Sequence, residues 1–394
     1  MVFNNFLIGI NYWPAAKAMY WWKKFETEEV NEDFNKLSGW GINTVRIFLN
    51  WEDFQPSPGL ISRHVLGHLH QVADLAKAYN LFLMPTFFCG HMSGVNWMPE
   101  WMLIPGTDAN RFPVFSNNRI CQAKIRNFYT EPDIIEAQSF QIREVCSSLK
   151  GHEAIIAYDL GNESSNCVIP PQPADGQSWL RTMTSLIGLY SGGIPVTLGM
   201  HAEDLEENRN LGPQDAALYC DFLCMHGYPF YLSWIRNPYE AEVLPFLGLI
   251  TAWLGQKPVL FQEFGAPTYP ALPPFLEPET MFKCPLGTEE EVTDYYREAV
   301  QGLYEENMTG CMAWCFADYT PDLWNIPPLY QNPHERYFGL FRYDGSYKPA
   351  LKIMNQYINK PVNSLFLPPQ DKYTWLKDEE RAAFYDNPAY NLIR

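Results

Sequence analysis

The feature that most constrains the fold is a strand-like segment followed by a helical pattern, repeated along most of the chain. Eight runs rich in apolar residues indicate buried strands. They span 6–13, 44–51, 81–88, 154–161, 195–201, 222–229, 258–264 and 311–317. Between most of them lie amphipathic helical patterns, at 28–37, 65–79, 134–149, 178–190 and 290–306. Eight such units in 394 residues predict an α/β fold, the (β/α)8 TIM barrel, as a single domain with long βα loops.

The barrel accounts for most of the chain. We expect residues 1–360 to form it, and residues 361–394 to be a C-terminal tail that packs on the barrel or is partly disordered. The loops after the third and eighth strands are long, at 89–130 and 319–342. Because functional groups of this fold project from the C-terminal strand ends, these loops are where we expect substrate to be bound.

Composition restricts the partners. A formal net charge of −17 makes a nucleic acid or an anionic membrane a poor partner, because no basic cluster offsets that field. Aromatic residues form 15% of the chain, which fits either a large core or a surface that stacks on sugar rings. The apolar run at 6–10 is too short for an export signal, so we expect a cytoplasmic protein.

Cysteine and histidine spacing gives no sign of a metal or cofactor. The nine cysteines are odd in number and lack Cys-x-x-Cys spacing, which favours reduced core thiols. His64, His68 and His70 share one helix among apolar residues, without a carboxylate at ligand spacing. We therefore interpret them as structural residues and expect neither a metal nor a cofactor.

Two glutamates stand at the ends of strongly hydrophobic strands. Glu163 follows Asn162 at the end of one, and Glu263 follows Gln262 at the end of another. A carboxylate at the tip of a buried strand is costly unless it is used. Two carboxylates on one barrel rim are what the cleavage of a glycosidic bond requires.

The order of motifs along the strands resembles a known family. The motifs are the run at 6–14, Val45-Arg46-Ile47, Gly161-Asn162-Glu163, His226-Gly227-Tyr228, Gln262-Glu263-Phe264-Gly265 and Met312-Ala313-Trp314. Together they resemble glycoside hydrolase family 5 of the retaining (β/α)8 glycosidase clan, over roughly residues 6–360. The segments 19–22 and 86–94 look most like an intracellular bacterial β-mannosidase branch.

The resemblance implies roles for the two glutamates and their neighbours. Glu263 would be the nucleophile and Glu163 the acid/base, whose pKa we expect the nearby charge of Glu263 to raise. Arg46 and Tyr228 would keep Glu263 ionised. Asn162 would donate to the sugar 2-hydroxyl.

Other candidate substrate-binding or supporting residues have an open alternative. Trp314 is either an apolar floor for the sugar ring or a core residue. His226 would hydrogen-bond within the carboxylate network and His91 would contact a sugar hydroxyl, with a structural histidine as the equal alternative for each. Trp97 and Trp324, on the two long loops, complete the set. Five further acidic residues follow strands without an assigned role, namely Glu52, Asp53, Glu203, Asp204 and Asp318.

These observations predict a retaining β-glycoside hydrolase, an exo-acting β-mannosidase on short β-mannose-containing oligosaccharides. An endo-β-mannanase or a β-glucanase or β-glucosidase is the alternative within the same class. A catalytically silent carbohydrate-binding barrel is the alternative from another class. The sequence leaves the glycone, the linkage and the oligomeric state open.

Overall fold

A computed structural model describes residues 4–106, 110–270, 284–362 and 373–394. Eight parallel strands form one sheet in the order β11-β10-β3-β2-β1-β14-β13-β12. They are β1 (Leu7–Asn11), β2 (Thr44–Asn50), β3 (Phe82–Cys89), β10 (Tyr158–Asn162), β11 (Val196–Gly199), β12 (Leu223–His226), β13 (Val259–Phe264) and β14 (Gly310–Ala313). A parallel bridge between His201 and His226 joins the two edges. The predicted (β/α)8 barrel is confirmed, with one strand in each predicted segment.

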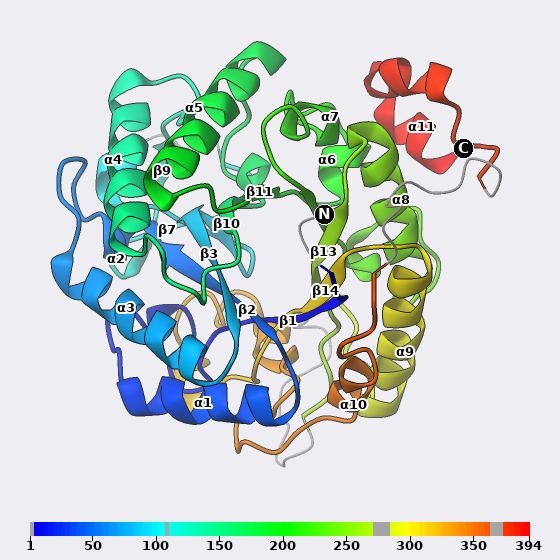
Figure 1. The fold of residues 1–394 in the computed structure, drawn as a ribbon, viewed down its shortest axis with the longest axis horizontal. Helices are drawn as coiled ribbons and strands as arrows, with labels where there is room; N and C mark the ends of the chain where they lie inside the picture. The colour runs from blue at the N-terminus through cyan, green and yellow to red at the C-terminus, as the bar shows by residue number, and fades with distance from the viewer. Residues whose placement is uncertain (1–3, 107–109, 271–283, 363–372) are drawn as a thin grey trace.

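The strands are buried along nearly their whole length because helices cover the outside of the barrel (Figure 1). Strand register places polar side chains level with one another at the carboxyl end. Asn11 pairs with Arg46 across β1 and β2, and His226 pairs with Glu263 across β12 and β13. The register therefore gathers residues from distant parts of the sequence at one end of the barrel.

The helices follow the predicted alternation. The principal ones are α1 (Thr27–Gly39), α3 (Arg63–Ala78), α4 (Pro132–Ser148), α5 (Pro173–Ser191), α8 (Val243–Gly255), α9 (Glu289–Glu305) and α10 (Ala350–Asn355). Three short helices follow two of the strands: α2 (Trp51–Phe54) follows β2, and α6 (Glu203–Glu206) and α7 (Pro213–Ala216) follow β11. Helix α8 was not among the predicted helices, because it is apolar around most of its circumference and lacks the periodicity of a surface helix.

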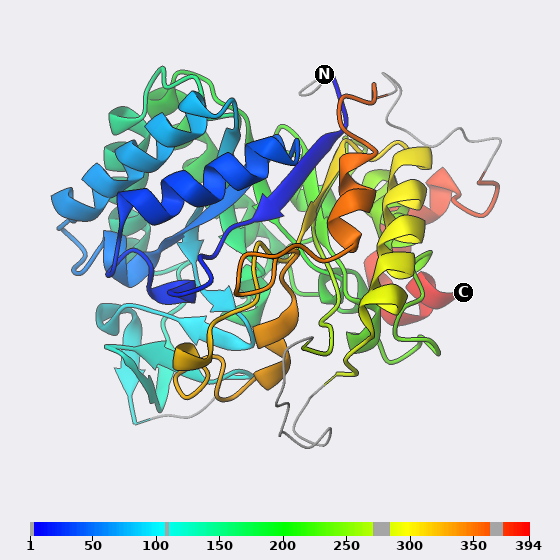
Figure 2. The same ribbon diagram turned by 90° about the horizontal axis from the view of Figure 1, so that it is seen from below.

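The segment after β3, expected as a loop, contains small strands. They are β4 (His91–Met92), β5 (Val95–Trp97), β6 (Leu103–Pro105), β7 (Val114–Ser116), β8 (Arg119–Cys121) and β9 (Ala123–Ile125). Asn117 and Asn118 both have positive φ, as a tight hairpin turn between β7 and β8 requires. Figure 2 shows these strands, in cyan, beside the gold segment that follows β14.

The described part of the C-terminal tail contacts the barrel. It forms a 3-10 helix (Asp378–Asp386) and α11 (Pro388–Ile393). The ring of Phe384 lies 6.1 Å from that of Trp253 in α8, and the Tyr385 hydroxyl donates to the carbonyl oxygen of Asp204 at 2.7 Å. The division into residues 1–360 and 361–394 stays a prediction, and residues 363–372 lie outside the described residues.

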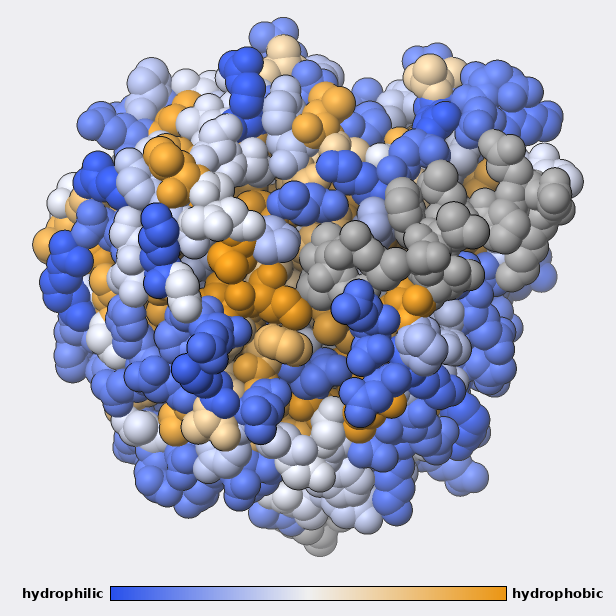
Figure 3. Space-filling view, viewed as in Figure 1, coloured by the Kyte–Doolittle hydropathy of each residue, from blue (hydrophilic) through white to orange (hydrophobic). Residues whose placement is uncertain are grey.

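The surface is mainly polar on the face that Figure 3 shows, where hydrophobic residues gather near the middle. Within the described residues, no helix is both long and apolar enough to cross a membrane. All nine cysteines are free thiols.

Candidate active site

A cavity of about 290 Å³ opens at the carboxyl end of the strands. This volume lies near the lower limit of small-molecule sites, and it suits a short ligand better than a polymer. Residues at strand ends and in the long loops line it. They include His91, Ser93, Arg111, Asn162, Glu163, His201, Glu203, His226, Tyr228, Glu263, Trp314 and Glu335.

Glu163 and Glu263 face each other across this cavity. Glu163 directly follows β10 and Glu263 lies in β13, and one oxygen from each carboxylate and a nitrogen of His226 all lie within 4.8 Å of one another. Glu163 has φ of 48°, a left-handed conformation that is unusual for a residue with a side chain. The short separation fits the ~5–5.5 Å of retaining glycosidases and not the ~6.5–9.5 Å of inverting ones.

Two donors hold the Glu263 carboxylate. Arg46 donates from Nη1 to Oε1 at 2.6 Å, and the Tyr228 hydroxyl donates to Oε2 at 2.9 Å. Glu263 is only 3% exposed. Both contacts favour its ionised form, which is the role that the resemblance implies for Arg46 and Tyr228.

Arg46 is itself fixed by a buried polar network. Its Nη2 donates to Asp159 Oδ2 at 2.7 Å and to Asn162 Oδ1 at 2.8 Å, and its Nη1 donates to Asn11 Oδ1 at 3.0 Å. The sequence did not identify Asp159 or Asn11 as parts of the site. Asp159 lies inside β10, away from its end, and Asn11 ends β1 but lies inside the longer strand predicted at 6–13, so neither stood at a predicted strand end.

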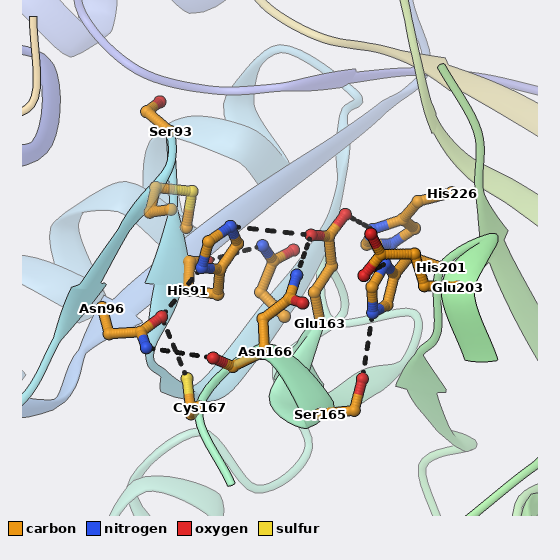
Figure 4. A network of polar contacts seen from close by, with 12 residues as sticks. His91, Ser93, Asn96, Glu163, Ser165, Asn166, Cys167, His201, Glu203 and His226 are labelled. Carbon is orange, nitrogen blue, oxygen red and sulfur yellow. Dashed lines mark hydrogen bonds and ion pairs between the residues drawn. The ribbon is translucent and has the colours of Figure 1, made fainter. Parts of the chain in front are cut away.

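A second set of contacts orients Glu163 (Figure 4). Asn166 Nδ2 donates to its Oε2 at 3.1 Å, and His226 Nδ1 lies 3.1 Å from its Oε1. His91 Nε2 lies 3.9 Å from Oε2, and the Nδ1 atom of the same ring lies 2.8 Å from Asn96 Oδ1. Both predicted histidines therefore lie within the carboxylate network.

Asn162 has a supporting position at the cavity wall. Its Oδ1 accepts from Arg46, and its Nδ2 donates to the carbonyl oxygen of His91 at 2.8 Å. The amide carries a second N–H, which leaves one donor for a ligand. A hydrogen bond to a sugar hydroxyl stays a prediction.

The pKa of Glu163 differs from the expectation that the charge of Glu263 raises it. Burial does raise the pKa of Glu163, but the imidazoles of His201, His226 and His91 outweigh burial and lower it below its ordinary value. Burial and the charge of Glu163 raise the pKa of Glu263, against His226 and Arg46. The expectation was wrong because it treated the two carboxylates in isolation from the histidines.

The lowering of the Glu163 pKa lasts only while the imidazoles are protonated. Burial lowers the pKa of His91 itself, so that ring is neutral at neutral pH. Without the positive charge of the imidazoles, burial favours the protonated form of Glu163. The cluster therefore titrates as one coupled unit.

Charged residues also lie at one side of the cavity. Glu203, which had no assigned role, lines the cavity and accepts hydrogen bonds from Arg111, and from Arg209 Nη2 at 2.7 Å. Burial opposes ionisation of Glu203, but the Arg111 hydrogen bonds and the nearby positive charges lower its pKa to about 2. Glu203 is thus an anion compensated by two arginines.

The other unassigned acidic residues have structural partners outside the cavity. Asp204 accepts from the Ser165 hydroxyl at 2.6 Å. Glu52 and Asp53 lie 3.1 and 3.3 Å from Lys23 Nζ, and Asp318 lies 2.7 Å from Lys348 Nζ.

Of the predicted tryptophans, only Trp314 lines the cavity. The indole of Trp97 donates to the carbonyl oxygen of Met92 at 3.3 Å and packs against Phe115. The indole of Trp324 donates to the carbonyl oxygen of Tyr319 at 2.9 Å. The structure therefore does not bring Trp97 and Trp324 into the site. Long loops of this size contain small cores of their own, and aromatic rings fill them.

One group of three side chains among the described residues has the spacing of metal ligands, namely Glu163, His226 and Glu263. The sequence did not show this group, because its members are brought together only by the closed barrel. Arg46 already places a positive charge 2.6 Å from one of the carboxylates, which opposes the binding of a cation there. The group is therefore better suited to exchanging protons.

Several cavity residues were missed, and His201 and Glu335 are two of them. His201 follows β11, and a search of the residues just after each strand would have identified it. Glu335 lies in a 3-10 helix (Pro333–Tyr337) of the long loop after β14, and no local sequence signal sets it apart from other loop acids.

Comparison with known proteins places the chain among glycosidase structures. No family model matches it. A 73-residue stretch is 25% identical to a glucosylceramidase of Rhizopus delemar, over 18% of this chain and 11% of that protein.

The similar solved structures cover most of the chain. A GH5_18 protein from Streptomyces cattleya, in complex with Manβ1-4GlcNAc, has a TM-score of 0.73 at 21% identity, over 90% of this chain and 80% of its own. A GH5_18 protein from Bifidobacterium longum has a TM-score of 0.73 at 18% identity, over 91% of this chain and 81% of its own. An exo-β-1,4-mannosidase from Opitutaceae bacterium strain TAV5 has a TM-score of 0.72 at 25% identity, over 90% of this chain and 60% of its own. The chain therefore has the fold of these family 5 structures, and the resemblance to glycoside hydrolase family 5 predicted from its strand-end motifs is confirmed.

Proposed function

We propose that the protein is a retaining β-glycoside hydrolase and, more specifically, an exo-acting β-mannosidase that removes β-linked mannose from short oligosaccharides. The observation that carries the hydrolase assignment is the pair of glutamates with oxygens within 4.8 Å of each other, one of which is bound to Arg46 and Tyr228. A polar site that served only to bind sugar would not need two carboxylates at this cost.

The geometry supports a double displacement. In the protonation state of the coupled cluster that reacts, Glu263 is ionised and Glu163 is protonated. Glu263 attacks the anomeric carbon, and the bond between that carbon and the leaving oxygen breaks as Glu163 donates its proton to the oxygen. Glu163, now ionised, then accepts a proton from water, whose oxygen attacks the same carbon and releases Glu263. The two inversions give a product that retains the β configuration.

The finer assignment has separate support. The cavity is small, as an exo-acting enzyme requires, and two of the similar structures are an exo-β-1,4-mannosidase and a complex with Manβ1-4GlcNAc. An endo-acting enzyme on polymeric mannan or glucan would instead need an open cleft that admits a chain on both sides of the scissile bond.

A panel of aryl β-glycosides (mannoside, glucoside, galactoside and xyloside), with mannotriose and polymeric mannan, tests this proposal. We expect the highest kcat/KM on the mannoside and the shortening of mannotriose by one residue at a time. Rapid loss of viscosity in the mannan solution would contradict the exo assignment, and a higher kcat/KM on the glucoside would contradict the mannosidase assignment. Binding of mannotriose without turnover of any panel member would indicate a silent carbohydrate-binding barrel.

A further inference from the structure

Besides Glu163, Glu263 and Glu203, the cavity contains a fourth carboxylate, Glu335, that the double displacement does not use. It is 7% exposed and lines the cavity wall. Within the described residues, no lysine or arginine lies within ion-pair distance of it, whereas Glu263 has Arg46 and Glu203 has Arg111 and Arg209. A buried carboxylate without a cationic partner lowers stability, so its position calls for a function.

The contacts of Glu335 are to neutral donors and involve one of its two oxygens. The Ser93 hydroxyl donates to Oε2 at 2.9 Å, and the Trp314 indole N–H donates to the same oxygen at 3.2 Å. The other oxygen, Oε1, lies 3.6 Å from His334 Nε2 and receives no hydrogen bond from the residues that the structure describes. His334 Nε2 in turn lies 2.8 Å from the Tyr231 hydroxyl. Oε1 therefore keeps its acceptor capacity for a ligand in the cavity.

The bond to Trp314 fixes where such a ligand would meet Glu335. An indole that supports a sugar does so with its ring face, and the N–H on its edge points along the plane of the ring. Because that N–H donates to Glu335, the carboxylate lies at the edge of the Trp314 ring. A sugar stacked on Trp314 directs its equatorial hydroxyls outward in this plane.

Two segments far apart in the sequence hold Glu335 in place. Ser93 lies in the turn between β4 and β5, and the Asn332 amide donates from Nδ2 to the Ser93 carbonyl oxygen at 2.8 Å. Gly94 has φ of 72°, and a Cβ at this position would meet Asn332 Nδ2 at 2.8 Å. The β4–β5 turn is thus bound closely to the segment that follows β14, as Figure 2 also shows.

We propose that Glu335 is a specificity-determining residue, which accepts a hydrogen bond through Oε1 from a hydroxyl of the sugar bound between Trp314 and Glu263. The proposal rests on the proposed hydrolase function and adds to it the residue that recognises the glycone. The interaction is remote from the scissile bond, so it would distinguish sugars by the presence of one hydroxyl and not by the leaving group.

The protonation of Glu335 affects the strength of this contact. Burial raises the pKa of Glu335 to about 7, opposed by the hydrogen bonds from Ser93 and Trp314 and assisted by the charges of Glu263 and Glu163. The other titratable side chains that interact with its charge are His334, Tyr228, Tyr231, Tyr319, Cys284 and Cys315. Burial raises the pKa of each of these tyrosines and cysteines, so they stay neutral near pH 7.

The test uses aryl β-mannosides that lack a single hydroxyl, at C3, C4 or C6, beside the parent mannoside. For one of the three positions we expect removal of the hydroxyl to lower kcat/KM of the wild type by about 10- to 100-fold. In Glu335→Gln, kcat/KM on the parent mannoside should fall by a similar factor. Removal of that same hydroxyl should then lower kcat/KM of the variant only slightly further. Such non-additivity shows that the two groups interact, and a change in folding alone would not produce it.

Two variants complete the experiment. Ser93→Ala removes a neighbour of Glu335 and keeps the carboxylate, so discrimination at the same hydroxyl should weaken without being lost; it also replaces Glu335→Gln as the test if that variant does not fold. Glu52→Gln is the control. Glu52 lies outside the cavity and binds Lys23, so this variant should discriminate among the three deoxy mannosides as the wild type does. The inference would be overturned if, for each of the three hydroxyls, its removal lowered kcat/KM by the same factor in Glu335→Gln as in the wild type. An inactive wild type would instead overturn the proposed hydrolase function on which it rests.

Discussion

Arg46 donates from Nη1 to Oε1 of Glu263 at 2.6 Å, and both side chains are buried at the carboxyl end of the barrel. The same guanidinium binds Asp159 at 2.7 Å through Nη2. One cation thus compensates two carboxylates. Arg46 therefore has a structural role in addition to holding Glu263 ionised.

The first prediction concerns this buried cation. Arg46→Ala leaves Asp159 and Glu263 without their partner, so we expect the free energy of unfolding to fall by about 3–5 kcal/mol. Urea denaturation at pH 7 measures it. Lys77→Ala, which removes an ion pair with Glu153 in which the two side chains are 53% and 74% exposed, should cost less than about 1 kcal/mol. Equal losses in the two variants would contradict the compensating role of Arg46.

The second prediction concerns His226 and the pH profile. Burial alone would lower the pKa of His226, but the charges of Glu263 and Glu163 raise it, so the imidazole stays protonated to higher pH than a free histidine. Its charge lowers the pKa of both carboxyls. Without that charge both pKa values rise, and both limbs of the bell-shaped kcat/KM profile should move to higher pH by roughly 1 unit in His226→Gln. His152→Gln, which alters an imidazole paired with Asp74, is the matched control and should leave the profile unchanged. A shift to lower pH in His226→Gln would show that the sign of the coupling is wrong.

The sequence predicted the barrel because each of its eight strands is buried and apolar and therefore has a local signature. It predicted Glu163 and Glu263 because strand ends are the positions where this fold exposes side chains to substrate. The resemblance to family 5 placed Arg46 and Tyr228 beside Glu263, and the structure has both contacts. The barrel and the positions of the two glutamates are consequences of short-range patterns and a single closed topology.

Other parts of the site depend on packing that no local pattern reports. The three imidazoles near Glu163 come from different strands and loops, so the direction of its pKa shift could not be predicted from two carboxylates. The wrong placement of Trp97 and Trp324 has a similar origin, since the sequence does not tell whether a loop tryptophan faces the cavity or packs within its own loop. Glu335 joins the cavity only because Ser93 lies beside it across 242 positions of sequence.

The third prediction concerns metal ions. Although Glu163, His226 and Glu263 have the spacing of metal ligands, Arg46 opposes a cation at this site. Activity and thermal midpoint should therefore be unchanged after dialysis against EDTA and after addition of Mg²⁺ or Zn²⁺ at equimolar concentration. Loss of activity in EDTA that a divalent ion restores would contradict this prediction.

The last prediction separates the two glutamates by the configuration of their products. Glu163→Ala should slow substrates with poor leaving groups far more than activated aryl glycosides, because only the former need a proton. Glu263→Ala should lower the activity on every substrate by more than about 10³-fold, because covalent catalysis is the step that all of them share.

Azide provides the decisive measurement. In the variant at 163 it attacks the glycosyl-enzyme and gives a β-glycosyl azide, whereas in the variant at 263 it occupies the vacated site and gives the α product. A β azide from the 263 variant, or an α azide from the 163 variant, would show that the two roles are reversed, and unchanged turnover in both would exclude the carboxylate pair from the chemistry.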